Sequence, residues 1–387
     1  MLGPVLDVFR LRQYFDVIVR ARDLIGGLRD DAGLLDDARR ALVSLPVDTW
    51  PEPISPFPPI ESPTRSATTL RVALCATGGS GALASVVGVA RAFEERGMRP
   101  SLISLCSGSA LFGFPIAAGI PADDVAAFSA GLRPHHYIDV DWPRLALLAP
   151  TLARGFAGII RGDRLEATYR ELLGDITLGE LPIPAYAPIW SIEENRVEYL
   201  GPRTHPNLSV ARAVRMAVSL PLFVEPVQLG GSYWCDGGIV DIFPVVPALE
   251  LEPRADAVVA VNGFYPPEFA GEDATGWQDR SASIVSIASQ VRTCQQVELA
   301  RVNLQRLRAT MQVAMIEPVP YEKVRGVGFY RQFLSNAEWS QFMEAGRACG
   351  LRALDQLAET PARRPRASSG AAHLGAAKAH LELTESP

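Results

Sequence analysis

Residues 71–119 read RVALCATGGSGALASVVGVARAFEERGMRPSLISLCSGSALFGFPIAAG, and this stretch decides the fold. It opens with an apolar run, 71–76, that is long enough for a buried strand. The glycine-rich segment 77–81 follows and predicts a tight turn. Residues 82–96 then show helical spacing, and Gly97 is a typical helix cap. The first half of the stretch therefore predicts a strand, a turn and a helix.

The second half of the stretch repeats the pattern. Residues 101–106 form another apolar run, Ser107-Gly108-Ser109 predicts a sharp turn, and 110–119 predicts a second helix. Strand, turn and helix in alternation are typical of parallel α/β proteins. We therefore expect an α/β fold with a mostly parallel central sheet and helices on both faces.

The remainder of the chain is expected to complete this fold. Its elements are predicted as a mainly helical region over 121–185, a hairpin over 187–193 and 196–200, a helix over 210–220, a strand over 227–234, a strand over 255–262 and a long helix over 281–310.

Composition shifts divide the chain into four parts. Residues 1–45 carry aliphatic residues at helical spacing and predict an N-terminal helical extension. Residues 46–66 hold seven prolines and predict an extended linker. Residues 67–355 form the predicted α/β domain. Residues 359–387 lack apolar periodicity, which indicates a disordered tail.

Charge and cysteine usage exclude several functional classes. The formal charge of −6 and the pI of about 5.5 argue against a nucleic-acid partner, which requires a basic footprint. Five cysteines without a CxxC pair argue against a disulfide framework or a zinc site, and we expect neither a metal nor a cofactor. No apolar leader precedes the charged N-terminal residues, so we expect a cytoplasmic protein, with peripheral membrane contact left open.

Ser107 is the first candidate for chemistry. A serine between a buried strand and a helix lies at a helix N-terminus, where free N–H groups favour negative charge. A nucleophile elbow needs such a sharp turn with small neighbours, and Cys106, Gly108 and Ser109 are small. Ser109 is the rival nucleophile, and a simple helix-capping role for Ser107 is the structural alternative.

The turn Gly78-Gly79-Ser80-Gly81 is the second candidate. Consecutive glycines let backbone N–H groups converge on an anion, as in an oxyanion hole. The stretch 79–84 also matches the G-x-G-x-x-A dinucleotide fingerprint, which expects an acidic residue at the end of the next strand. Cys106 and Ser107 stand there instead, so nicotinamide chemistry is disfavoured. A plain tight turn remains the alternative.

Asp236 is the third candidate because it ends an apolar run and precedes Gly237-Gly238. Such a residue is also a common turn former. A Ser–Asp–His triad of the α/β-hydrolase type requires a histidine after the acid, and only His373 and His380 follow, both in the predicted tail. We therefore expect Asp236 to accept the serine proton directly.

Together these segments resemble the patatin-like phospholipases. The resemblance rests on ATGGSGALASVVGVARAFEERG (76–97), SLISLCSGSALFGFPIAAG (101–119) and ARAVRMAVSLPLFVEPVQLGGSYWCDGGIVDIFPV (211–245). It implies a Ser107–Asp236 dyad, an acyl-enzyme and an oxyanion hole at residues 78–81. The implied substrate is a lipid acyl ester, either a phospholipid, a lysophospholipid or a neutral lipid.

The sequence departs from the family pattern at the elbow and near Asp236. Leu105 and Ser109 replace the two elbow glycines, and the glycine-rich turn lacks its usual basic residue. Ala217 and Ile242 stand where the family often has Ser and Asn. A non-catalytic protein that binds an anionic lipid or metabolite on the same fold is therefore the competing hypothesis. The apolar stretch 142–162 fits either core or a membrane-interface helix.

Overall fold

The computed structural model describes residues 70–140, 157–251, 254–270, 284–324, 331–332 and 335–359. The predicted N-terminal helices, the proline-rich linker, the tail beyond residue 359 and most of the stretch 142–162 lie outside these residues. No helix in the described part of the chain is both long and apolar enough to cross a lipid bilayer.

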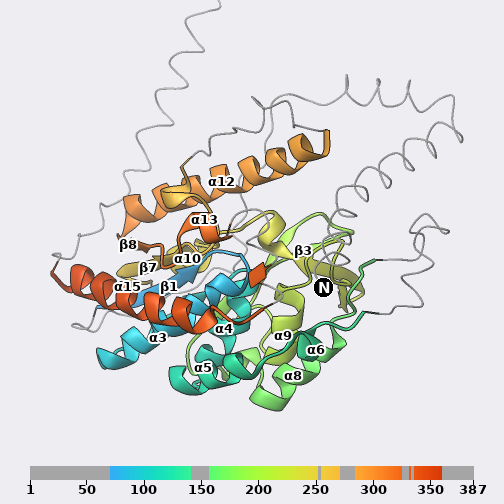
Figure 1. Ribbon diagram of the computed structural model, residues 1–387, viewed down its shortest axis with the longest axis horizontal. Coiled ribbons are helices and arrows are strands. Elements are labelled where there is room, and N and C mark those ends of the chain that lie inside the picture. Colours follow the sequence, from blue (N-terminus) through green and yellow to red (C-terminus); the bar gives the residue numbers. More distant parts are fainter. Residues whose placement is uncertain are drawn as a thin grey trace, which may run out of the picture.

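The described strands form one eight-stranded sheet in the order β5-β6-β3-β2-β1-β7-β8, with β4 paired to β3. Five neighbouring strands, from β3 to β8, run parallel, and β4, β5 and β6 pair in antiparallel fashion. The predicted mostly parallel sheet is confirmed (Figure 1). The strands are β1 (Val72–Ala76), β2 (Ile103–Ser104), β3 (Ala185–Ser191), β4 (Val197–Leu200), β5 (Val227–Leu229), β6 (Ser232–Asp236), β7 (Ala257–Val261) and β8 (Gln312–Ile316).

Helices connect these strands and cover both faces of the sheet. The α-helices are α3 (Ser85–Glu95), α4 (Gly108–Ala117), α5 (Ala122–Gly131), α6 (Pro134–Tyr137), α8 (Asp163–Leu173), α9 (Val210–Ala217), α10 (Val246–Glu250), α12 (Ile284–Thr310), α13 (Tyr321–Val324) and α15 (Trp339–Glu359). Short 3-10 turns are η1 (Gly81–Ala84), η2 (Leu178–Glu180), η3 (Gly237–Ile239) and η4 (Pro267–Phe269).

The first α/β unit follows the prediction closely, with one shortening. β1 matches the predicted strand, and the predicted helix 82–96 divides into η1 and α3. The predicted strand 101–106 is reduced to Ile103–Ser104, because the chain turns sharply at Ser107 and α4 begins at the next residue. The sharp turn therefore lies where the sequence predicts it, but the strand before it is short.

The segment 227–236 differs from its prediction. A single strand over Val227–Trp234 is wrong, since the chain reverses at Gly230 and Gly231 and forms the antiparallel hairpin β5–β6. Both glycines have positive φ, 59° and 87°, which is the backbone of a two-residue hairpin turn. The reversal makes Asp236 the last residue of β6.

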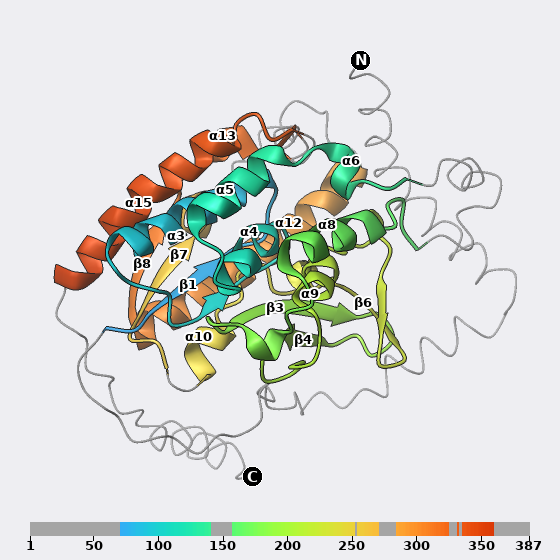
Figure 2. The ribbon, with the colours of Figure 1, turned by 90° about the horizontal axis from the view of Figure 1, so that it is seen from below.

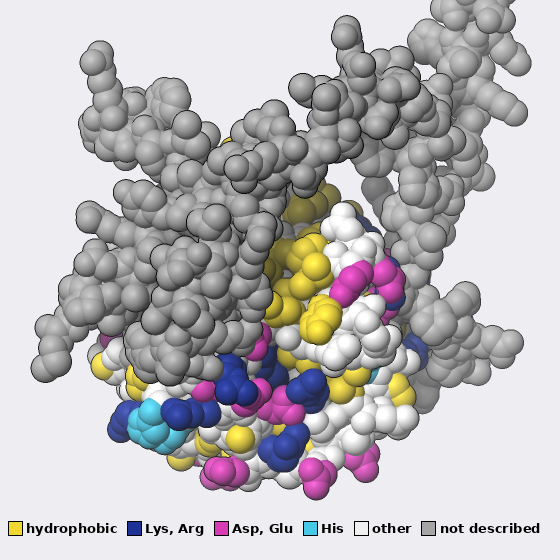
Figure 3. All heavy atoms as spheres, turned by 90° about the vertical axis from the view of Figure 1, so that its right-hand side faces the viewer, with side chains coloured by type: hydrophobic (Ala, Val, Ile, Leu, Met, Phe, Trp, Pro, Cys, Tyr) yellow, Lys and Arg dark blue, Asp and Glu magenta, His cyan; other side chains and the backbone are white. Residues whose placement is uncertain are grey.

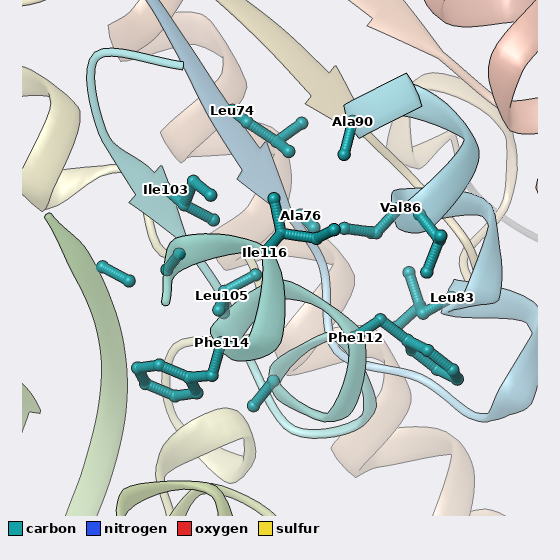
Figure 4. Packing of buried hydrophobic residues seen from close by; sticks show 14 of the residues in the cluster. Leu74, Ala76, Leu83, Val86, Ala90, Ile103, Leu105, Phe112, Phe114 and Ile116 are labelled. Atoms are coloured by element: carbon teal, nitrogen blue, oxygen red, sulfur yellow. The ribbon is translucent and has the colours of Figure 1, made fainter. Parts of the chain in front are cut away.

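Two hydrophobic cores lie on opposite faces of the sheet. Along β1, Val72, Leu74 and Ala76 enter the larger core with α3, α4 and α15, whereas Ala73 and Cys75 enter a second core with α10 and α12. This alternation is that of a strand covered on both faces. Figure 2 shows α3, α4, α5 and α15 together on one side of the sheet, and Figure 4 shows side chains of β1, α3 and α4 in the larger core.

The C-terminal elements β8 and α15 were not predicted individually. A five-residue apolar run such as β8 cannot be assigned to strand or helix from periodicity alone. α15 packs along α3 at van der Waals distance because glycines face the partner backbone at two points. A Cβ built on Gly88 would lie 1.7 Å from the Met343 carbonyl oxygen, and one built on Gly346 would lie 2.1 Å from that of Ser85.

We expect Gly88→Ala to lower the free energy of unfolding by about 1–3 kcal/mol, because the added methyl group forces α3 and α15 apart. Chemical denaturation followed by circular dichroism measures this change. Gly131→Ala is the matched control, since a Cβ at Gly131 meets nothing within 4 Å. Equal stability of the two variants would contradict the close helix contact.

Candidate active site

Two strands, β2 and β6, pair with the same edge of β3, and their C-terminal ends face each other. β2 runs parallel to β3, and its last bond joins the Leu105 N–H to the Tyr186 carbonyl oxygen at 2.8 Å. β6 runs antiparallel along the same edge and ends at Asp236, opposite Ile189. β4 occupies the other edge. The residues that follow β2 and the last residue of β6 therefore meet, and this brings Ser107 and Asp236 together.

Ser107 occupies a strained turn between β2 and α4. Its φ is 49° and its ψ is −123°, a conformation that a residue with a side chain rarely adopts. It stands at the cap position of α4, yet its side chain accepts no hydrogen bond from the helix. The side chain is partly exposed. The capping role is therefore absent, and the hydroxyl is presented at the helix N-terminus.

Neighbouring side chains explain how the elbow forms without its usual glycines. The buried hydroxyl of Ser109 accepts a hydrogen bond from the Cys106 N–H (2.7 Å) and donates one to the Cys106 carbonyl (2.8 Å). These bonds close the turn and leave Ser109 poorly placed as the rival nucleophile. Leu105 fits beneath α4 because Gly113 has no side chain, since a Cβ there would lie 2.3 Å from Leu105 Cδ2. Figure 4 shows Leu105 under this helix.

The glycine-rich turn lies directly against the elbow. A Cβ built on Gly108 would lie 2.3 Å from the Gly79 carbonyl oxygen, so the two turns touch through their backbones. The Gly78 N–H donates to the Ile242 carbonyl at 2.9 Å and is therefore engaged in holding the turn. Within the described residues, the N–H groups of Gly79, Ser80 and Gly81 donate to no other group. Of the four predicted donors, these three are free.

Asp236 is buried, with 1% of its surface exposed. Its Oδ1 accepts from the Gly238 N–H at 2.8 Å, and its Oδ2 has no partner of good hydrogen-bond geometry among the described residues. Burial raises the pKa of Asp236 to about 7, while contact with the Ser107 side chain and the Gly238 N–H lower it. Ser107 thus lies against the carboxylate without a fully formed bond, as is common in unliganded active sites.

A buried arginine that sequence reasoning missed supports Asp236 from the side of α9. The Asp236 N–H donates to the Ser219 carbonyl at 3.0 Å. The Ser219 hydroxyl in turn accepts from the Arg215 guanidinium and donates to the Arg215 carbonyl. Arg215 is 3% exposed and also donates to the carbonyls of Arg161 and Glu225. The available signal was a pair of arginines, Arg212 and Arg215, inside a helical run whose other residues are apolar.

The other titratable candidates play different parts. His205 lies beside Glu198 at 3.5 Å, and burial lowers its pKa. His135 is exposed and His136 partly exposed on α6. His373 and His380 lie outside the described residues. In the part of the chain that the structure describes, no group of three His, Cys, Asp or Glu side chains could hold a metal ion.

Three cysteines line the backs of the site turns. Cys75, Cys106 and Cys235 are all buried. Burial raises the pKa of Cys75 and Cys235 to about 12 and that of Cys106 well above its usual value. Such thiols stay protonated at neutral pH and act as small packing residues rather than nucleophiles.

Comparison with known proteins finds one family model and several relatives that match this chain. Residues 74–249 match the sequence model of the patatin-like phospholipase family. An uncharacterized NTE family protein of Mycobacterium tuberculosis is 27% identical over 201 residues, 51% of this chain and 51% of that protein. The uncharacterized protein YqhO of Bacillus subtilis is 27% identical over 180 residues, 42% of this chain and 61% of that protein. The chain thus spans about half the length of the mycobacterial relative.

Solved structures of low sequence identity also match. VipD from Legionella pneumophila aligns with a TM-score of 0.44 and 17% identity, covering 76% of this chain and 68% of that one. Human GIVD cytosolic phospholipase A2, in complex with methyl gamma-linolenyl fluorophosphonate, aligns with a TM-score of 0.39 and 10% identity, covering 74% and 59%.

We expect Asp236→Asn to stabilise the protein at alkaline pH. A carboxyl whose pKa rises from 3.8 to about 7 on folding binds its proton more tightly in the folded state, so its contribution to stability is lost as pH rises from about 4 through 7. The amide avoids this loss, with a gain of up to about 4 kcal/mol at pH 8.

Denaturation at pH 5 and pH 8 measures the change. The difference between variant and wild type should be about 2 kcal/mol at pH 5 and should grow to about 4 kcal/mol at pH 8. If the difference in free energy of unfolding between Asp236→Asn and wild type does not change with pH, burial of the Asp236 charge is not the cause of the difference.

Proposed function

Residues 74–249 place this chain in the patatin-like phospholipase family, and from that premise we propose that it is a serine acyl hydrolase that cleaves lipid acyl esters. The observation that carries the proposal is the contact of a strained, partly exposed serine with a buried carboxylate of raised pKa. A general base works best when its pKa lies near the operating pH, and Asp236 meets this condition.

Acylation begins when Ser107 Oγ attacks the ester carbonyl and Asp236 accepts the hydroxyl proton. The carbonyl oxygen becomes an oxyanion, for which the free N–H groups of Gly79, Ser80 and Gly81 supply donors. Each such donor contributes about 3–4 kcal/mol in well-studied hydrolases. Collapse of the intermediate breaks the ester C–O bond, and Asp236 returns its proton to the leaving alcohol.

Deacylation reverses these roles with water as the nucleophile. Asp236 removes a proton from water, which attacks the acyl-serine carbonyl. The same N–H groups stabilise the second oxyanion, and Ser107 leaves as the alcohol by taking the proton from Asp236. The fatty acid is released and the dyad returns to its starting state. No histidine and no external cofactor enter this sequence.

Apolar residues around the dyad favour an acyl chain as substrate. Leu111 lies one helical turn beyond Ser107 and is partly exposed, as is Phe264, whose Cβ lies against Gly79. Val240, which follows the Asp-Gly-Gly turn, is 40% exposed. Figure 3 shows hydrophobic side chains above a mixed group of basic and acidic ones on one face.

The competing hypothesis is a non-catalytic protein that holds an anionic lipid or metabolite at the glycine-rich turn. The altered elbow favoured it at the level of sequence. The bonds of Ser109 to Cys106 and the fit of Leu105 against Gly113 weaken it, because both substitutions are accommodated without losing the strained turn. Covalent labelling separates the two hypotheses.

We expect an alkyl fluorophosphonate probe to label Ser107, and mass spectrometry of the labelled peptide identifies the site. Ser107→Ala should lose the label and hydrolysis of a p-nitrophenyl ester, since Ser107 supplies the hydroxyl that contacts Asp236. Ser109→Ala should keep the label on Ser107, with lower stability from the opened turn. Labelling of Ser109, or of no serine, would contradict the proposed nucleophile.

The pH dependence of kcat/KM should follow the ionisation of Asp236. Because only the carboxylate accepts the serine proton, activity should rise with pH to a plateau, with an apparent pKa of about 7. Asp241, whose pKa burial raises to about 6, is the control. In Asp241→Asn the apparent pKa of the rise in kcat/KM should stay near 7. An apparent pKa at the ordinary carboxyl value of about 4 would contradict the role of Asp236 as the base.

A further inference from the structure

Gln296 of α12 contacts the turn that carries Asp236. Its Nε2 donates to the Gly238 carbonyl at 2.8 Å, and its Oε1 accepts from the Tyr265 hydroxyl at 3.2 Å. The N–H of the same Gly238 donates to Asp236 Oδ1 at 2.8 Å. One glycine therefore links α12 to the carboxylate, with a hydrogen bond on each side.

Asn303 makes a second contact from the same face of α12. It lies seven residues after Gln296, which is two helical turns. Its Nδ2 donates to the Phe243 carbonyl at 2.9 Å and to Asp241 Oδ1 at 3.2 Å. These two residues flank Ile242, whose carbonyl accepts the Gly78 N–H. Asn303 thus fixes the short segment that holds the glycine-rich turn.

Both polar side chains lie in an otherwise apolar contact. Their neighbours on α12 that face the second core are hydrophobic and buried, namely Val297, Ala300, Leu304 and Leu307. Such a face would hold the helix in place by burial alone. The side-chain amides of Gln296 and Asn303 are partly buried at this contact, and each donates to a backbone carbonyl of the segment 237–243.

We propose that α12 positions the catalytic carboxylate and the glycine-rich turn relative to each other, through Gln296 and Asn303. Both are positioning residues, since neither touches Ser107 or the reacting atoms. The inference rests on the proposed hydrolase function. It extends the site beyond the family-matched segment 74–249, in which neither residue lies.

The test compares Gln296→Met and Asn303→Leu with Gln295→Met in the full chain. Gln295 is the neighbouring residue on α12 and is exposed, so it serves as the matched control. For the two positioning variants we expect kcat on a p-nitrophenyl ester to fall roughly 10- to 100-fold, because a small displacement of the base or the donors is costly. KM should stay within about twofold, and the labelling rate of Ser107 by the fluorophosphonate should fall in parallel with kcat.

The outcomes separate the two ideas. If the wild type hydrolyses the ester and Gln296→Met and Asn303→Leu match Gln295→Met in kcat, the positioning role is wrong while the hydrolase function stands. If the wild type neither hydrolyses the ester nor reacts with the probe, the proposed function is wrong and the positioning role with it. Should Gln296→Met fail to fold, Gln296→Glu is compared with Gln295→Met in the same way. Glutamate keeps the size of the side chain and the oxygen that accepts from Tyr265, but it lacks the N–H that donates to Gly238.

Discussion

The shared edge of β3 is the constraint on which the site depends. β2 and β6 run toward each other along this edge and stop short of meeting. β2 is paired as far as Tyr186 and β6 as far as Ile189, so both segments leave the sheet between these two residues. A serine after one strand and an aspartate at the end of the other are brought together by backbone pairing. Their side chains need supply no attraction of their own. The proposed dyad is therefore a property of strand register.

Burying the carboxylate opposes folding, and the surrounding structure offsets that cost. Asp236 loses its hydration and keeps one firm hydrogen bond to its side chain, from Gly238. The backbone around it is held on two sides, by Arg215 of α9 together with Ser219 just after that helix, and by Gln296 on α12. Rigid neighbouring residues can hold a side chain such as that of Asp236 in a position and protonation state that it would not adopt in water. In the proposed function, this loss of stability is the cost of a general base whose pKa burial raises to about 7.

Much of this arrangement could be predicted from local sequence. The first strand, the glycine-rich turn and the elbow at Ser107 depend on apolar runs and small residues a few positions apart, which periodicity and turn chemistry can identify. The hairpin at Gly230 was missed because two short strands and one longer strand share the same composition. Gln296 and Asn303 could not be predicted, since each acts through a backbone carbonyl that is distant in sequence. Arg215 was visible only as a charged residue in a mostly apolar run, which does not identify its partners.

The position of β1 in the sheet has a consequence for how the protein can be divided. The family match ends at residue 249, yet β1 pairs along its whole length with β7, which begins at Ala257, and β7 pairs in turn with β8. Truncation at the match boundary would cut the sheet beside β1, the middle strand of its parallel part. Without β7, the five apolar residues of β1 would form an edge strand with unpaired N–H and C=O groups. Such an edge is the usual template for intermolecular aggregation. The smallest piece that keeps this sheet intact extends past β8, and it includes α15, which packs along α3.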